Sequence, residues 1–464
     1  MFFSIPCCSI QILTYGDDVK KYQVIVLGAG PAGGASAAAC ARSGLKTALI
    51  EDYGFGGTCP LRGCNPKKIM TQTGDIIAWA AALEGKGIDK APGIDWGKMA
   101  RFRDGFVSGK KEKIRSAYED LGIDTYLGRA TFLDENQIQV GKDILEAKFF
   151  VLATGIKPAR LGVPGEELIS HSDDFLALTS LPDRICFIGG GFISFEFASL
   201  ALRAGARVSM VHRGSRVLKQ FDPDLSKALM QALVEEGLDL HLDSPLQSVS
   251  RKGSVLLVKA GQGRVNITAD IVVHGAGRIP DVEGLNLDRA NIDVSSKGIK
   301  VDRFMQCPGN PKFFAAGDVT DTSYALTPTG DLEGRVAAAN IINPRSQACD
   351  YKGVPRVVYT SPPLCAVGLL EEEARSMGLT LQIIHEDMSG WFSWSGAGQK
   401  HAQCKILIDQ NREVIIGAHM LGLGADEMAN LFAMAVSLEL SVKEMKKVLL
   451  AYPTRGYYFK NMLG

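Results

Sequence analysis

The sequence predicts an α/β protein in which two similar βαβ units precede a C-terminal region of α+β type. Three observations predict this class. A glycine-rich turn joins a β-branched strand to an Ala-rich helix over residues 22–52, the same pattern returns over residues 184–214, and the pattern changes again near residue 350. Repeated strand, helix and strand units of this kind form parallel sheets covered by helices.

The composition is that of an ordinary globular protein of about three domains, with 464 residues, 46% hydrophobic and 22% charged. Lys plus Arg and Asp plus Glu both number 51, so the overall charge points to no nucleic acid or anionic membrane as a partner. The longest uncharged run, residues 24–41, is broken by glycines and a proline. We therefore expect no membrane span, a cytoplasmic location and small-molecule partners.

The cysteines and the N-terminal end add two expectations. Ten cysteines are too few for a disulfide scaffold in a chain of this length. Residues 1–20 lack the basic segment and cleavage site of a signal peptide, so we interpret them as an extension. Cys7 and Cys8 lie side by side there and have the chemistry to bind a metal or pass electrons, but plain extension residues are the favoured interpretation, and we expect no metal site.

The first βαβ unit has the pattern of a dinucleotide-binding turn. Gly28, Gly30 and Gly33 follow the strand and open the helix, and Glu51 closes the next strand. The glycines let backbone N–H groups approach a pyrophosphate at the helix N-terminus, and Glu51 is placed to accept hydrogen bonds from ribose hydroxyls. A structural turn with a solvated acid is the alternative.

The second βαβ unit has Gly189 and Gly191 at its turn, with Ser194 in place of a third glycine. The 23 positions that separate Gly28 from Glu51 lead from Gly189 to His212, so the ribose-binding acid is missing. The basic residues Arg213, Arg216 and Lys219 follow at once. Cations suit the 2′-phosphate of NADPH, whereas NADH would find no acceptor for its hydroxyl. The sequence therefore favours NADPH, with a solvated basic loop as the alternative.

The segments around the second unit indicate how the domains connect. An apolar strand ends at Thr154 and Gly155 before a Pro-containing loop, which places a boundary there. Two later strands, in ADIVVHGAGRIP and KFFAAGDVTD, also end in glycine-rich turns, and a helix follows with its start near Thr327. We expect these later elements to rejoin the first domain.

The region after residue 350 has the pattern of a separate α+β domain. The run QCKILIDQNREVIIGAHMLG, residues 403–422, predicts two strands joined by a polar turn. Apolar residues at helical spacing follow from Asp426.

The run GFGGTCPLRGCNPKKIM, residues 54–70, holds two cysteines five residues apart. In a regular helix their Cα atoms would be about 8 to 9 Å apart, too far for a disulfide, which needs about 4.4 to 6.8 Å. Pro60, Gly63 and Pro66 favour a distorted helical turn in which Cys59 and Cys64 can pair. A disulfide that closes so small a loop stabilises a fold little, so redox exchange explains the cysteine pair better. The helix N-terminus and the lysines that follow favour a thiolate there.

Several separate motifs resemble those of the FAD-dependent pyridine nucleotide-disulfide oxidoreductases, a family that includes reductases of glutathione, lipoamide and mercuric ion. The resemblance covers nearly all of the chain after the extension. The matching segments are GGTCPLRGCNPKK with Gly57 and Thr58, the segment Ala153, Thr154 and Gly155, the segment Gly277, Arg278, Ile279 and Pro280 with Asp281 in place of Asn, and AAGD ending at Asp318.

The resemblance implies a role for each matched residue. Cys64 would face the flavin as the charge-transfer thiolate, and Cys59 would be the interchange thiol that attacks the substrate. Lys68 would lie by the flavin and pair with Glu196. Asp318 would hold the ribityl chain of FAD, and Thr327 would begin a helix whose N-terminus faces the flavin. Arg213 and Lys219 are similar in placement to the family's phosphate-binding arginines, which agrees with the preference for NADPH.

The C-terminal segment departs from the family pattern. Disulfide reductases of the family carry a histidine and a glutamate there, supplied to the partner subunit's site in a homodimer. Tyr452 and Tyr457 stand at these two positions. A phenol is a poor base at neutral pH but can donate a proton. A related tyrosine occurs in mercuric reductases, yet no cysteine follows Cys404, so the cysteine pair that delivers mercury is absent.

The main hypothesis is an NADPH-dependent enzyme that passes electrons through FAD and the Cys59–Cys64 disulfide to a disulfide, either of a small molecule or of a small protein, or to another soft electrophile. Reduction of mercuric ion or quinones is one alternative, and a non-catalytic redox-sensing or electron-transfer flavoprotein is another. The expected fold is two Rossmann-like dinucleotide-binding domains plus a C-terminal α+β dimerisation domain. The expected limits are 1–20 for the extension, 21–155 and 273–345 for the FAD domain, 156–272 for the NAD(P) domain and 350–464 for the dimerisation domain.

Overall fold

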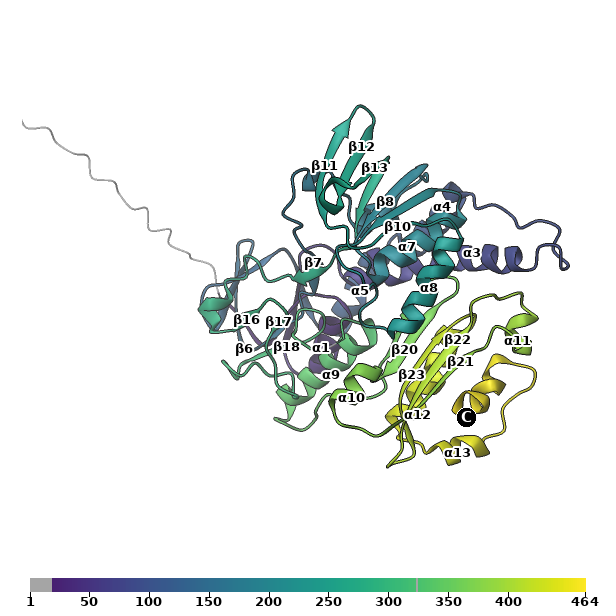
Figure 1. Ribbon diagram of the computed structural model, residues 1–464. Coiled ribbons are helices and arrows are strands. Elements are labelled where there is room, and N and C mark those ends of the chain that lie inside the picture. The colour runs from purple at the N-terminus through teal and green to yellow at the C-terminus, as the bar shows by residue number, and fades with distance from the viewer. Residues whose placement is uncertain (1–18, 323) are drawn as a thin grey trace, which may run out of the picture.

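The computed structural model describes residues 19–322 and 324–464, so the extension with Cys7 and Cys8 lies outside the described residues. Three layered units make up the fold (Figure 1), and the second is inserted in the chain of the first. The first two are built on sheets with parallel strands, and the third is built on an antiparallel sheet. The α/β class with a C-terminal α+β domain is confirmed.

The first unit has a central seven-stranded sheet with the order β3-β2-β1-β6-β5-β4, and β18 pairs with the end of β6, at Phe150–Leu152, on the side opposite β1. The pairs β1·β2, β1·β6, β2·β3 and β6·β18 are parallel, whereas β4 and β5 form an antiparallel extension. Its elements are β1 (Lys20–Leu27), α1 (Pro31–Arg42), β2 (Thr47–Glu51), α2 (Thr58–Arg62), α3 (Cys64–Ala82), α4 (Trp96–Val107), α5 (Lys110–Glu119), β3 (Asp124–Leu127), β4 (Ala130–Phe132), β5 (Gln137–Val140), β6 (Asp143–Leu152), β18 (Phe313–Ala315) and α9 (Thr327–Ile342).

The second unit is inserted between β6 and β18. Its parallel sheet has the order β10-β9-β8-β14, and an antiparallel three-stranded sheet, β11-β12-β13, stands beside it at the top of Figure 1. The elements are α6 (Ser172–Ala177), β8 (Arg184–Ile188), α7 (Phe192–Arg203), β9 (Arg207–Val211), α8 (Pro223–Glu235), β10 (Asp239–His241), β11 (Leu246–Lys252), β12 (Val255–Ala260), β13 (Val265–Ala269) and β14 (Ile271–His274).

Two connections link the first and second units. They pair as β7 (Ile156–Pro158) and β15 (Arg278–Pro280), and a small hairpin, β16 (Val294–Ser295) and β17 (Gly298–Ile299), follows.

The strands predicted in ADIVVHGAGRIP and KFFAAGDVTD lie in different sheets, which corrects the expectation that both rejoin the first domain. β14 does not rejoin the first domain, because Val273 and His274 pair with Phe187 and Ile188 of β8. Only β18 returns to the first sheet, where the ring of Phe313 stacks on that of Phe150 with centroids 5.1 Å apart. The expected limit at 272/273 therefore cuts β14, because burial of its valines completes the second sheet.

The third unit is an antiparallel sheet with the order β19-β20-β23-β22-β21, covered by α12. The predicted strand pair is confirmed as β22 and β23, and the helices follow as expected. The elements are β19 (Pro355–Val358), β20 (Leu364–Gly368), α10 (Glu371–Ser376), β21 (Leu381–Asp387), α11 (Phe392–Ser395), β22 (Gln403–Asp409), β23 (Val414–Leu421), α12 (Ala425–Ser437), α13 (Val442–Lys447) and a 3₁₀ helix over Arg455–Leu463.

Among the described residues, no helix combines the length and apolar character needed to cross a membrane.

Candidate active site

The first glycine turn joins β1 to α1 at the carboxyl edge of the parallel strands. Gly28 has φ +100°, a conformation open to glycine, and a Cβ there would lie 2.2 Å from the carbonyl oxygen of Ala153. A Cβ on Gly33 would meet the Gly28 carbonyl, whereas one on Gly30 would meet nothing within 4 Å. The turn is therefore packed against the protein on one side and open on the other, where a pyrophosphate could approach.

Glu51 holds the turn from β2. Its carboxylate is buried and accepts hydrogen bonds from the backbone N–H groups of Ala29, at 2.7 Å, and of Tyr53 and Gly54, at 3.0 and 3.2 Å. These contacts fix the carboxylate next to the turn. Its predicted contact with a ribose remains a prediction.

The residues around this turn fit a bound dinucleotide such as FAD. In the part of the chain that the structure describes, no side chain caps the N-terminus of α1 or of α9. The two helices pack so closely that a Cβ on Gly334 would lie 2.0 Å from the Ala32 carbonyl oxygen. The buried Thr154 hydroxyl has no hydrogen-bond partner in the described chain. Burial raises the pKa of Asp318, and only the charge of Arg278 offsets this. A ligand with phosphate and hydroxyl groups suits this site. The N–H groups at the helix N-termini can bind its phosphates, and the Thr154 hydroxyl and the Asp318 carboxylate can bind its hydroxyls.

The two cysteines lie on either side of a break between α2 and α3. α2 begins after Gly57, which has φ +66° and approaches the first turn so closely that a Cβ would lie 2.6 Å from the Gly30 Cα atom. The helix stops at Gly63, and α3 starts anew at Cys64. The predicted distortion is confirmed. Both cysteines are free thiols here, so the disulfide implied by the resemblance is not formed in this structure.

The surroundings of the two thiols give them different acidities. A hydrogen bond from Cys59, helped by the Thr327 hydroxyl and the charge of Lys67, lowers the pKa of Cys64 to about 6. The Thr327 oxygen lies 3.7 Å from the Cys64 sulfur. The same interaction with Cys64, together with burial, raises the pKa of Cys59. At neutral pH the negative charge therefore resides on Cys64 and the proton on Cys59.

The lysine that pairs with Glu196 is Lys67, which corrects the expected role of Lys68. The Lys67 ammonium lies 2.7 and 2.8 Å from the two carboxylate oxygens of Glu196, which is only 1% exposed. Lys67 stands three residues after Cys64 and shares its face of α3, whereas Lys68 is turned by about 100° and lies 3.7 Å from Asp426.

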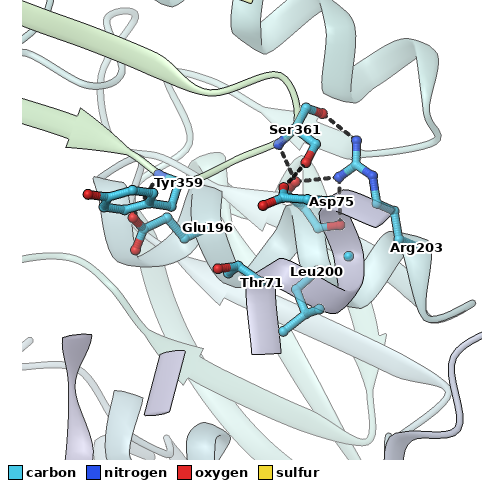
Figure 2. Close-up of a pocket in the computed structure, with 9 residues that line it drawn as sticks. Thr71, Asp75, Glu196, Leu200, Arg203, Tyr359 and Ser361 are labelled. Atoms are coloured by element: carbon cyan, nitrogen blue, oxygen red, sulfur yellow. Dashed lines mark hydrogen bonds between the residues drawn. The ribbon is translucent and has the colours of Figure 1, made fainter. Parts of the chain in front are cut away.

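Tyr359 of the third unit joins the two lysines to Glu196. Its backbone N–H donates to Glu196 at 2.9 Å, and the ammonium groups of Lys67 and Lys68 lie 4.7 and 4.3 Å from its ring centroid. Figure 2 shows the ring next to the Glu196 carboxylate. All three units therefore meet at this carboxylate.

A small cavity of about 10 Å³, room for about one water, lies behind Glu196. Asp75 of α3 faces it and accepts from the Ser361 hydroxyl, and Arg203 of α7 donates to the Ser361 carbonyl (Figure 2). Burial raises the pKa of Asp75. This network ties the same three units together beside the ion pair.

The second glycine turn repeats the first with one substitution. The Nδ1 atom of His212 accepts from the Gly190 N–H at 3.0 Å, as Glu51 accepts from the Ala29 N–H. Burial, and the charges of Lys219 and Arg213, lower the pKa of His212. The histidine therefore keeps the contact with the turn but supplies no carboxylate. Gly189 and Gly191 bound this turn, and the buried Ser194 packs behind it at Gly275.

The basic loop, residues 213–219, presents two of its basic side chains to solvent. Arg213 and Lys219 are exposed and form no ion pair among the described residues. Arg216 instead contacts Glu372 of α10 at 3.0 and 3.1 Å.

The remaining site residues predicted from the sequence include Gly155, Gly277, Arg278 and Tyr452. Arg278 donates to the Ile156 carbonyl at 2.7 Å and follows Gly277 on the connection that faces Gly155. Tyr452 is 64% exposed, and its ring packs edge-on against Tyr457 with centroids 4.8 Å apart. Within the described chain, neither a hydrogen bond nor a ring contact joins Tyr452 to the cysteines.

Sequence reasoning missed two residues of the site, Tyr359 and Glu333, and two contacts of residues that it had named, Lys67 with Glu196 and Thr327 with Cys64. Lys67 was detectable from its spacing of three residues after Cys64, but Tyr359 carries no motif that signals its place. The contact between the Thr327 hydroxyl and Cys64 spans 263 residues. Glu333 of α9 is fully buried and accepts from the N–H of Gly317 at 2.7 Å, which holds the turn before Asp318. Only the folded arrangement of α9 shows these last two contacts.

Two family models cover the chain. Residues 22–334 match the model described as pyridine nucleotide-disulphide oxidoreductase, and residues 354–463 match the dimerisation domain of the same family. Glutathione reductase of Burkholderia cepacia is 30% identical, over 95% of this chain and 98% of its own length. Mercuric reductase of Staphylococcus aureus is 29% identical, over 93% and 80%. Dihydrolipoyl dehydrogenase of Bacillus subtilis is 30% identical, over 92% and 95%.

A solved structure has the same fold. The HOCl-induced flavoprotein disulfide reductase RclA of Escherichia coli superimposes with a TM-score of 0.85 at 23% identity, over 95% of this chain and 99% of its own. At that identity the likeness supports the fold alone. The glycine turns, the cysteine pair and the matched models agree, and the chain is an FAD-dependent enzyme of the pyridine nucleotide-disulphide oxidoreductase family.

Proposed function

We propose that this enzyme is an NADPH-dependent disulfide reductase, in which electrons pass from NADPH through FAD to a Cys59–Cys64 disulfide and then to an acceptor. The acceptor is a disulfide or another soft electrophile. The observation that carries the proposal is the pair of thiols on either side of the break between α2 and α3, where Cys64 has its pKa lowered to about 6 and Cys59 retains the proton.

The residues that would hold FAD are those of the first turn and its surroundings: Gly28, Gly30, Gly33, Glu51, Gly57, Thr58, Thr154, Gly155, Asp318 and Thr327. When bound, FAD supplies the two-electron chemistry that links a pyridine nucleotide to a thiol pair. Lys67 and Glu196 would keep a buried, paired charge next to it. The Thr327 hydroxyl and the N-terminus of α9 would favour negative charge at the same place.

The thiol chemistry uses two sulfurs in turn. Cys59, after losing its proton, attacks one sulfur of the acceptor disulfide to form a mixed disulfide, and the other acceptor sulfur leaves as a thiolate that takes up a proton. The Cys64 thiolate then attacks the Cys59 sulfur, which releases the second acceptor sulfur as a thiolate and restores the Cys59–Cys64 disulfide. The dithiol is oxidised by two electrons and the acceptor is reduced by two.

Three features support NADPH over NADH. His212 replaces the acid that would bind a 2′-hydroxyl, and the basic loop offers Arg213 and Lys219 to a 2′-phosphate. Gly189, Gly191, Gly277 and Arg278 would surround the remainder of the coenzyme.

We further propose a homodimer in which Tyr452 of one protomer completes the other's site, where its phenol donates a proton to the leaving thiolate. The family's dimerisation domain and the exposed position of Tyr452 support this. A cytoplasmic location stays a prediction.

A second candidate is a reductase of mercuric ion or quinones. Tyr452 and Tyr457 support it, because such acceptors need no base to shuttle a proton to a thiol.

The first experiment is anaerobic titration of the purified enzyme with stoichiometric NADPH. We expect a long-wavelength absorbance from thiolate-to-flavin charge transfer, lost in Cys64→Ser and kept in Cys349→Ser, a control that removes a half-buried thiol elsewhere. Persistence of the band in Cys64→Ser would refute the assignment of Cys64.

The second experiment follows NADPH oxidation with glutathione disulfide, lipoamide, small disulfides, Hg(II) and quinones. Turnover of a disulfide that disappears in the Cys59→Ser/Cys64→Ser double variant supports the main proposal. Activity that survives in the double variant selects direct reduction of quinones or metals.

A further inference from the structure

Arg216, in the middle of the basic loop, is held by the third unit rather than left free for a ligand. Its Nη1 atom donates to both carboxylate oxygens of Glu372, at 3.0 and 3.1 Å. Its Nη2 atom donates to the carbonyl oxygens of Phe221 and Lys219, at 3.3 and 3.5 Å. One guanidinium therefore links α10 to the backbone of the loop that carries Lys219.

A buried charge cluster fixes the end of the same loop. Lys405 of β22, only 5% exposed, lies 2.7 Å from Glu371 of α10, 2.8 Å from Asp224 and 3.2 Å from Asp222. Asp222 caps α8 directly after the loop. Burial opposes the charge of Lys405, but its bonds to Asp224 and Glu371 outweigh this and raise its pKa. The neighbours Glu371 and Glu372 thus attach the loop to the third unit at two points.

The start of the loop is attached to the coenzyme turn. His212 accepts from the Gly190 N–H, and its Nε2 atom lies 3.1 Å from the Arg216 carbonyl, to which the neutral tautomer donates. The Leu218 N–H donates to the Gly190 carbonyl at 2.9 Å. Between these attachments, Arg213 and Lys219 remain exposed.

We propose that Glu372, acting through Arg216, positions the basic loop so that Arg213 and Lys219 face the 2′-phosphate of NADPH. The inference rests on the proposed use of NADPH and deepens it, because it makes a residue of the C-terminal domain part of coenzyme selection. Arg216 and Glu372 are positioning residues, and neither touches the phosphate.

The geometry favours positioning over competition. In a competition model, Arg216 leaves Glu372 and binds the phosphate when the coenzyme arrives. Arg216 would then lose its hydrogen bonds to the Phe221 and Lys219 carbonyls as well as its ion pair with the carboxylate. The two models predict opposite effects when the Glu372 charge is removed. Positioning predicts weaker binding of the 2′-phosphate, and competition predicts tighter binding.

The test compares binding of 2′,5′-ADP and 5′-AMP by calorimetry, and KM for NADPH and NADH, in the holoenzyme. We expect Glu372→Gln to weaken 2′,5′-ADP binding and raise KM for NADPH about two- to fivefold, the range of an exposed ion pair, while 5′-AMP binding, KM for NADH and kcat stay unchanged. Glu386→Gln, an exposed acid on β21 in no ion pair among the described residues, is the matched control and should change nothing.

The charge-exchanged pair Arg216→Glu/Glu372→Arg separates positioning from direct contact. It restores an ion pair between loop and α10 while placing a negative charge at position 216, so we expect 2′,5′-ADP to bind more tightly than to Arg216→Glu alone, by at least about twofold. Tighter 2′,5′-ADP binding by Glu372→Gln, no effect of that substitution, or no recovery in the exchanged pair would each overturn the proposal.

Failure of the coenzyme assignment itself would be seen separately. A wild-type enzyme that binds 2′,5′-ADP no better than 5′-AMP would refute NADPH selection before any variant is compared. A wild type that prefers 2′,5′-ADP, together with an unaffected Glu372→Gln, would refute only the positioning role.

Discussion

Adjacent lysines at the start of α3 have very different surroundings. Lys67 forms a close ion pair with the buried Glu196, whereas Lys68 is partly exposed and lies 3.7 Å from Asp426. Removing one member of a buried pair leaves the other charge unpaired, which costs far more than losing a surface contact.

We therefore expect Lys67→Met to lower the free energy of unfolding by about 3 kcal/mol and to slow reduction of the flavin by NADPH. Lys68→Met, the matched control, should change the free energy of unfolding by less than about 1 kcal/mol. Urea unfolding and stopped-flow absorbance measure the two effects. Equal losses in both variants would contradict the assignment of Lys67.

The acidity of Cys64 depends first on the hydrogen bond from Cys59. Its pKa of about 6 lies below that of an ordinary thiol, so the thiolate exists above pH 6 and its contribution to stability is lost as the pH falls through that value.

Replacing Cys59 by Ala removes the donor, and we expect the pKa of Cys64 to rise by about one unit or more. Ultraviolet absorbance of the thiolate in the reduced protein, titrated against pH with Cys64→Ser as background, measures the change. A Cys59→Ala protein that titrates at the wild-type pH would show that Thr327 and Lys67 suffice.

At the scale of elements, the position of the cysteines depends on contact between two turns. The turn before α2 contacts the turn before α1 at Gly57, where the space admits no side chain larger than the hydrogen atom of glycine. Flavin binding and thiol placement are thus built on the same contact.

Gly57→Ala should separate these turns and release the flavin, because its Cβ would lie 2.6 Å from a backbone atom. Gly44→Ala is the matched control, since Gly44 also has a positive φ, +82°, but a Cβ there meets nothing within 4 Å. The positive φ costs Gly44→Ala about 1 kcal/mol of backbone strain. Gly57→Ala bears about 1 to 3 kcal/mol, because Gly57 also has ψ −156°, in a region that is essentially limited to glycine. Visible absorbance per chain reports bound flavin, and equal retention in the two would argue against the contact.

Elements with a local signal were predictable, and contacts between distant segments were not. The glycine turns, the helix start at Thr327 and the strands β22 and β23 follow from residue order alone. The strand β14 was assigned to the wrong sheet, because an apolar run does not specify its neighbour. The hydrogen bond from Gly190 to His212 and the Arg216–Glu372 pair also depend on how segments meet in the fold.

At the scale of the whole molecule, a single chain leaves several large apolar side chains of α3 and of the third unit exposed. Ile76 and Trp79 of α3 are exposed, as are Leu431 and Met434 of α12 and Leu438 directly after it, and Leu449 is 94% exposed three residues before Tyr452. Exposed apolar surface of this kind marks an interface, which fits a family that carries a dimerisation domain.

If Tyr452 completes the partner's site, two defective chains should complement each other. Cys59→Ser and Tyr452→Ala homodimers each lack part of both sites, whereas a mixed dimer has one complete site. Subunit exchange in a one-to-one mixture should restore about a quarter of wild-type activity, because half of the dimers are mixed and half of their sites are complete.

The control mixes Cys59→Ser with a chain carrying both substitutions, which should remain inactive. A mixture no more active than the mean of its parents would place each complete site within one chain.

The pairing of β18 with β6 has a consequence for synthesis on the ribosome. β5 pairs with only the first part of β6, Asp143–Glu146, and β18 begins at Phe313, so the end of β6 at Phe150–Leu152 lacks a partner on that side until about 160 further residues have been made. At about 5 to 20 residues per second, that is roughly 8 to 30 s with an unpaired strand edge. The nascent chain can fold its inserted middle unit during this delay, and it is then most vulnerable to aggregation and most in need of chaperones.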